Sequence, residues 1–115
     1  MLGSTLRQQR EALKATDRAY SLRQVALRVG IEPAYLSKIE RGEVPPPGEE
    51  TIKKLAAELN LDADVLLALA GKASTDLQDV IRKRPQLFAE LIRQLKEVPD
   101  HAVLSVVREV SDGDW

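Results

Sequence analysis

The sequence has 115 residues, with 17 Lys and Arg against 18 Asp and Glu, one His and no Cys. This length leaves room for one compact domain or two very small ones, which excludes most elaborate enzyme folds. Without cysteine there is no thiolate metal site, and one His is too few for an imidazole site, so we expect no metal and no cofactor. The longest apolar run, residues 65–70, is far shorter than the roughly 20 residues that cross a bilayer. We therefore expect a cytoplasmic protein of bacterial or phage type, with no membrane partner.

The net charge of −1 hides an uneven distribution. Residues 1–41 carry eight Lys and Arg against four Asp and Glu, a net charge of +4, so residues 42–115 carry −5. An asymmetry of this size predicts that the basic N-terminal part carries the function and that the rest of the chain is acidic. Near-neutral total charge is therefore no argument against a nucleic-acid partner.

Apolar spacing predicts five helices in the first 71 residues. Ser21 is a plausible N-cap for the second helix, Gly30 ends it, and Pro33 is suited to the first position of the third. The fifth segment is apolar on nearly every side, so we expect it deep in the core. The predicted helices cover residues 4–16, 22–29, 33–41, 49–59 and 63–70.

From residue 72 the pattern predicts a separate helical extension, so we expect two domains, residues 1–71 and 72–115. A helix from Thr75 to Lys83 is followed by two segments with wide apolar stripes and a turn at residues 98–100. These stripes favour a helical hairpin that mediates dimerisation, although the second is so rich in valine that a strand is an alternative. The residues predicted to mediate dimerisation are Leu87, Phe88, Leu91, Ile92, Leu95, Val103, Val106, Val107 and Val110.

Two short helices joined by a glycine-containing turn are typical of the helix-turn-helix. The residues SLRQVALRVGIEPAYLSKIERG, followed by ETIKKLAAELNLDADVLL, strongly resemble the Cro/phage-repressor class of helix-turn-helix regulators, also called the XRE family. The resemblance covers residues 6–70. It implies an all-α, five-helix, lambda-repressor-like domain, two copies of which read a two-fold DNA operator.

The resemblance also implies which residues meet DNA. Lys38 can donate to guanine, and the Ala34 methyl can contact a thymine methyl. The positions expected to reach base edges are Glu32, Pro33, Ala34, Ser37 and Lys38. Contacts to the DNA backbone, which set register without reading sequence, are expected from Ser21, Arg23, Gln24, Tyr35 and Arg41. This chain departs from the family at Leu22, where many relatives place a glutamine that contacts the backbone.

The leading hypothesis is a sequence-specific DNA-binding transcriptional regulator, a repressor that binds a palindromic operator as a homodimer. A second is an antitoxin, or a repressor controlled by a partner peptidase. A third is a protein-interaction adaptor that keeps the helix-turn-helix only as a scaffold. The sequence contains no nucleophile–base pair, metal set or phosphate loop, so we do not expect an enzyme.

Overall fold

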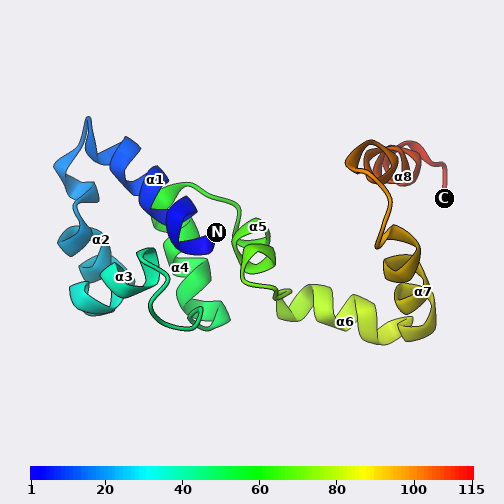
Figure 1. Cartoon of the computed structure of the whole chain (residues 1–115), viewed down its shortest axis with the longest axis horizontal. Coiled ribbons are helices and arrows are strands. Elements are labelled where there is room, and N and C mark those ends of the chain that lie inside the picture. The colour runs from blue at the N-terminus through cyan, green and yellow to red at the C-terminus, as the bar shows by residue number, and fades with distance from the viewer. The chain divides into compact units, whose positions relative to one another are not determined.

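The computed structural model describes all 115 residues and is helical, with no strand (Figure 1). This confirms the all-α expectation. In chain order the elements are α1 (Leu2–Lys14), the short 3-10 helix η1 (Arg18–Tyr20), α2 (Leu22–Val29), α3 (Pro33–Glu40), α4 (Glu49–Leu59), α5 (Ala63–Leu69), α6 (Thr75–Lys83), α7 (Pro85–Leu95) and α8 (Asp100–Asp112). The chain divides into two compact units, which we call unit 1 (residues 1–75) and unit 2 (residues 76–115).

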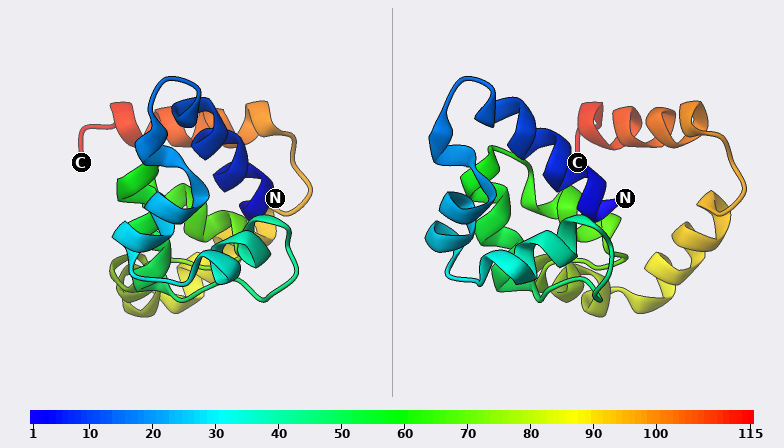
Figure 2. Two further views of the ribbon diagram at one scale, coloured as in Figure 1. Left: turned by 90° about the vertical axis from the view of Figure 1, so that its left-hand side faces the viewer. Right: turned by 60° about the vertical axis from the view of Figure 1, so that its left-hand side comes forward.

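Unit 1 has one aliphatic core. α1 and α2 each pack against both α3 and α4, and α4 also packs against α5 (Figure 2). The apolar faces predicted from the spacing point inward, because helices this short are stabilised chiefly by burying one face. The buried apolar side chains are Leu2, Leu6, Val25, Ala26, Val29, Leu36, Ile39, Ile52, Leu55, Ala56, Leu59, Leu66 and Leu67.

The position of α5 corrects one prediction. This helix does not lie deep in the core, because only Leu66 and Leu67 are buried while Val65 is 56% exposed. α5 packs chiefly on α4 and so covers its apolar residues on one side only. Continuous apolar sequence therefore does not mean burial on every side.

The boundaries of α2 and α3 follow from local capping. The Ser21 side chain accepts a hydrogen bond from the Gln24 amide at 3.2 Å, as predicted for an N-cap. Gly30 ends α2 with φ 84°, a left-handed conformation that glycine adopts without steric cost. Pro33 occupies the first turn of α3. The helix-turn-helix geometry is therefore encoded by residues close together in the sequence.

α1 begins at Leu2, earlier than the predicted start at residue 4. Its first turn packs closely against α3. A Cβ atom on Gly3 would lie 2.4 Å from the carbonyl oxygen of Ile39 and 2.6 Å from that of Glu40. Only glycine permits this approach, so the beginning of α1 can rest directly on the last turn of α3.

Unit 2 contains α7, α8 and all of α6 except its first residue, Thr75, and none of these helices has a buried residue. α8 is helical throughout, so the strand alternative is wrong. α7 and α8 do not pack along each other, so the predicted hairpin is wrong as well. The stripes show which face of each helix is apolar, but they do not determine which surface covers it. No helix in the chain is long and apolar enough to span a membrane.

Candidate nucleic-acid interface

The side of α3 opposite the core is open to solvent. Leu36 and Ile39 anchor the helix in the core, whereas Ala34, Lys38 and the following Arg41 are exposed. Exposed residues among the ten expected at DNA are Arg23, Gln24, Glu32, Ala34, Lys38 and Arg41. The half-buried ones are Ser21, Pro33, Tyr35 and Ser37. All ten lie on α2, α3 or their immediate flanks.

A depression of about 290 Å³ brings the beginnings of α2 and α3 together. We call it the α2–α3 depression. Its walls include Arg23 and Gln24 from α2, and Glu32 and Pro33 from the start of α3. Residues expected at the DNA backbone and at the bases therefore share one concave surface.

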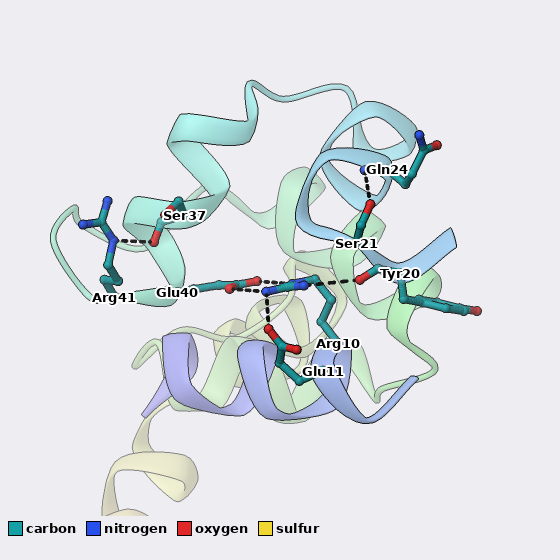
Figure 3. A network of polar contacts seen from close by, with 8 residues as sticks. All are labelled: Arg10, Glu11, Tyr20, Ser21, Gln24, Ser37, Glu40 and Arg41. Carbon is teal, nitrogen blue, oxygen red and sulfur yellow. Dashed lines mark hydrogen bonds and ion pairs between the residues drawn. The ribbon is translucent and has the colours of Figure 1, made fainter. Parts of the chain in front are cut away.

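The positively charged residues on this surface differ in whether they form ion pairs within the chain. Lys38 and Arg23 form no ion pair within the chain. Arg41 forms an exposed ion pair with Glu43, with 3.0 Å between Nη1 and Oε1. Figure 3 shows the second contact of Arg41, in which Nε donates to the Ser37 carbonyl at 3.3 Å. Because exposed pairs of this kind are weak, Arg41 can exchange Glu43 for an external anion at little cost.

A buried ion pair fixes the end of α3 against α1. Arg10 Nε donates to Glu40 Oε2 at 2.7 Å, and Arg10 Nη2 donates to Glu40 Oε1 at 3.0 Å (Figure 3). The hydrogen bond with Glu40 raises the pKa of Arg10 above its ordinary value. The same guanidinium donates to the Tyr20 carbonyl and the Glu11 carboxylate. The Arg10 guanidinium therefore connects α1, η1 and α3.

Sequence reasoning missed the role of Arg10 and Glu40. The two residues lie 30 positions apart, so no local pattern connects them. One signal was present: Leu2, Leu6 and Arg10 follow each other at four-residue intervals, which places Arg10 on the buried face of α1. A charged residue on such a face requires a partner, because an unpaired buried charge is strongly unfavourable.

A second ion pair connects α2 to α4. Arg28 Nε lies 2.6 Å from Glu58 Oε2, and the Arg28 guanidinium lies 5.5 Å from the centre of the Tyr20 ring. Both charged side chains are about one-third exposed, so the contribution to stability is modest. The contact orients α2, the helix that bears Arg23 and Gln24.

A further depression of about 290 Å³ lies between α1 and α3. We call it the α1–α3 depression. Ser37 and Arg41 contribute from the α3 side, Leu22 from α2, and Arg7 and Lys14 from α1. Leu22 packs against the core, so an apolar side chain stands where many relatives have glutamine. Arg7 and Lys14 are exposed and form no ion pair, and they extend the basic surface from α3 onto α1.

The family described as "Helix-turn-helix domain" matches residues 1–69, which cover α1 to α5 and thus the whole surface described above. The chain belongs to this helix-turn-helix family. The match includes α2, the Gly30 turn and α3, which are the elements that carried the resemblance in the sequence.

Several proteins named as regulators are similar to this chain. RghRB of Bacillus subtilis, an uncharacterized HTH-type transcriptional regulator, is 38% identical over 83% of this chain and 56% of its own length. Rv0474 of Mycobacterium tuberculosis, also named as uncharacterized, is 38% identical over 60% of this chain and 45% of its own. The HTH-type transcriptional regulator SlrR of Bacillus subtilis is 40% identical over 39% of this chain and 30% of its own.

The chain thus spans between about a third and just over half of the length of these relatives. A chain in the solved SinR protein/SinI protein complex is 24% identical, with a TM-score of 0.49 over 84% of this chain and 95% of that one. At this distance the likeness supports no further conclusion.

Proposed function

We propose that this protein is a sequence-specific DNA-binding transcriptional regulator, a repressor that occupies a palindromic operator as a homodimer. The observation that carries the proposal is the exposed face of α3 with the unpaired Lys38, held by a core and a buried ion pair in a helix-turn-helix domain. The relatives named as HTH-type transcriptional regulators support the same function.

In this proposal α3 enters the major groove and reads bases with its exposed side. A Lys38 ammonium can donate to O6 and N7 of guanine, and the Ala34 methyl can pack against a thymine methyl. Ser37 can donate or accept, and Glu32 can accept from cytosine N4. Pro33 adds shape but no hydrogen bond. Few side chains read bases directly, so we expect modest affinity for one half-site.

Contacts to phosphates set the position of α3 in the groove. On one side of α3, phosphates are bound by Arg23, Gln24 and the backbone amides that follow Ser21 at the start of α2. Along the helix and at its end, the phosphate contacts come from Tyr35 and Arg41. Arg7 and Lys14 add to this set, because they share the α1–α3 depression with Arg41 and have no ion-pair partner. Arg10 is not in the set, since its nitrogens are already engaged by Glu40, Glu11 and Tyr20.

Two copies are needed to give adequate affinity and specificity. A two-fold dimer matches the symmetry of a palindromic operator, with half-sites about 10 base pairs apart or a multiple of this spacing. The exposed apolar residues of α7 and α8 supply the contact surface for the dimer. Repression then follows from occupying a promoter.

The test compares three variants on a panel of sequences obtained by selecting bound genomic fragments. Lys38→Ala is expected to relax base preference, because it removes a contact to a base edge. Arg23→Ala is expected to weaken binding to all sequences alike and to reduce the salt slope by about one unit. Lys54→Ala, at an exposed lysine of α4 that is not among the residues expected at DNA, is the matched control and is expected to leave both quantities unchanged.

Fluorescence anisotropy at several salt concentrations measures both effects. Equal losses on every sequence from Lys38→Ala and Arg23→Ala would contradict the assignment of Lys38 to a base edge. Failure of the unmodified protein to retain any fragment at low salt would contradict DNA binding altogether.

A further inference from the structure

An apolar groove of about 450 Å³ lies in unit 2. We call it the α6–α7 groove. It is lined by Ile81 of α6 and by Pro85, Phe88, Ala89, Ile92 and Arg93 of α7. No residue of α8 contributes to it, and Ile92 is 62% exposed. Apolar surface left open in this way is typical of an interaction site.

α8 carries an apolar stripe that is also largely open to solvent. Val103, Val106, Val107 and Val110 follow the helix on one side, and Val107 is 53% exposed. Valine has one strongly preferred side-chain rotamer in a helix, so burying this stripe costs little conformational entropy. The stripe is thus a narrow row of stiff side chains, and the groove is walled by larger ones such as Phe88 and Ile92.

The charges around the two surfaces are complementary. Residues 81–96, which contain all the lining residues of the groove, carry five Lys and Arg against one Glu. Arg82 and Arg93 are paired within the chain with Asp79 and Glu90, so the cations without an ion pair here are Lys83, Arg84 and Lys96. Residues 100–114, which contain α8, carry four Asp and Glu against one Arg. Opposite charge steers such surfaces together and disfavours pairing of each surface with itself.

We propose that α8 of one copy binds in the α6–α7 groove of a second copy, and that the second copy returns the same contact. Each chain carries both halves, so two reciprocal contacts close a two-fold dimer that leaves neither apolar surface exposed. The proposal deepens the homodimer of the proposed function by specifying which surfaces meet. It makes groove-to-groove and α8-to-α8 pairing the wrong arrangements.

Sedimentation of the full chain without DNA tests the pairing, so its result is independent of whether the protein binds DNA. Ile92→Asp places a carboxylate in the groove, and Val107→Asp places one on the α8 stripe. In a homodimer of either variant, the substituted residue lies in both reciprocal contacts. The dimer dissociation constant is therefore expected to rise at least about a hundredfold, because burying an unpaired charge is strongly unfavourable. Val65→Asp, at a similarly exposed valine of unit 1, is the matched control and is expected to leave the dimer unchanged.

Mixing the two variants gives the decisive result. In a mixed dimer the intact α8 of the Ile92→Asp chain meets the intact groove of the Val107→Asp chain, so one of the two contacts is restored. Labelling one variant at its N-terminus lets sedimentation detect the mixed dimer, which should form far more tightly than either homodimer. Circular dichroism of each variant, with helix content equal to that of the unmodified chain, shows that the loss is not a loss of folding.

Three results would overturn the proposal. The first is a monomer at all concentrations up to the highest used, which would mean that α8 folds onto its own groove or stays free. The second is a dimer that survives either single substitution. The third is a pair of folded, monomeric variants that do not dimerise when mixed.

Discussion

Units 1 and 2 are built from the same kind of amphipathic helix but use it differently. In unit 1 the apolar stripes of five helices cover one another, and the buried charges of Arg10 and Glu40 satisfy each other. In unit 2 three amphipathic helices leave their apolar residues open, as in Leu87 at 69% exposed. An apolar stripe therefore predicts a helix and the face to be buried, while burial itself depends on a partner surface. Unit 1 supplies that surface within one chain, whereas the apolar faces of unit 2 stay open in the single chain, and we propose that a second copy covers them.

The largest expected difference between the units comes from removing one acidic residue in each. Glu40→Ala leaves the buried Arg10 with only the exposed Glu11 as an ion-pair partner and is expected to lower the free energy of unfolding by about 3–5 kcal/mol. Glu90→Ala removes the partner of Arg93 in an exposed pair on α7, and is expected to have no measurable effect on stability. Urea denaturation followed by circular dichroism measures both, and equal losses would contradict the distinction.

Truncating one leucine in each unit gives the next largest effect. Leu66→Ala, at a side chain 1% exposed, is expected to cost about 2–5 kcal/mol, because it leaves a cavity in the core. Leu87→Ala is expected to change the stability of the monomer by no more than about 0.5 kcal/mol. The measurement is thermal or urea unfolding at a protein concentration low enough to keep the chain monomeric. A large cost at Leu87 under these conditions would show that unit 2 has a core of its own.

The fit of α1 against α3 sharpens the description of unit 1. Replacing a helical glycine by alanine usually stabilises a protein by about 0.5–1 kcal/mol. Gly3→Ala is expected to do the reverse and cost about 1–3 kcal/mol, because the added methyl would collide with the Ile39 and Glu40 carbonyls. Gly48→Ala, where a Cβ meets nothing, serves as the control in the same denaturation experiment. Stabilisation by Gly3→Ala would mean that the two helices are further apart.

The smallest effect concerns pH. The amide and hydroxyl of Thr75, the first residue of α6, donate to Glu49 at 2.6 and 2.9 Å and lower the pKa of Glu49. A lowered folded-state pKa means that the contact contributes fully above the usual glutamate pKa and is lost as pH falls through the lowered value. NMR should show the Thr75 amide shift titrating together with the Glu49 carboxyl. A Thr75 amide shift that is independent of Glu49 would contradict the contact.

Much of unit 1 could be predicted from sequence because its signals are local. The bounds of α2 and α3 follow from Ser21, Gly30 and Pro33, which act within one turn of the helix they begin or end. The same segment predicts which side of α3 is exposed, since Leu36 and Ile39 mark the buried side.

The features that sequence reasoning missed depend on contacts between distant residues. Arg10 and Glu40, and Arg28 and Glu58, each lie 30 positions apart, and Glu49 meets Thr75 from 26 positions away. The prediction of a helical hairpin in unit 2 is wrong for a related reason. Spacing along one helix indicates a face, but contains no information about which surface covers it.

The most direct test of the account is selection of genomic fragments by the unmodified protein and by Ile92→Asp. We expect the unmodified protein to select two copies of a short sequence in inverted orientation, about 10 base pairs apart or a multiple of this spacing. Ile92→Asp should keep the preference for the short sequence and lose the paired arrangement along with most of the affinity. Selection of one unpaired site by both proteins, with equal affinity, would contradict the claim that unit 2 holds two DNA-binding domains together.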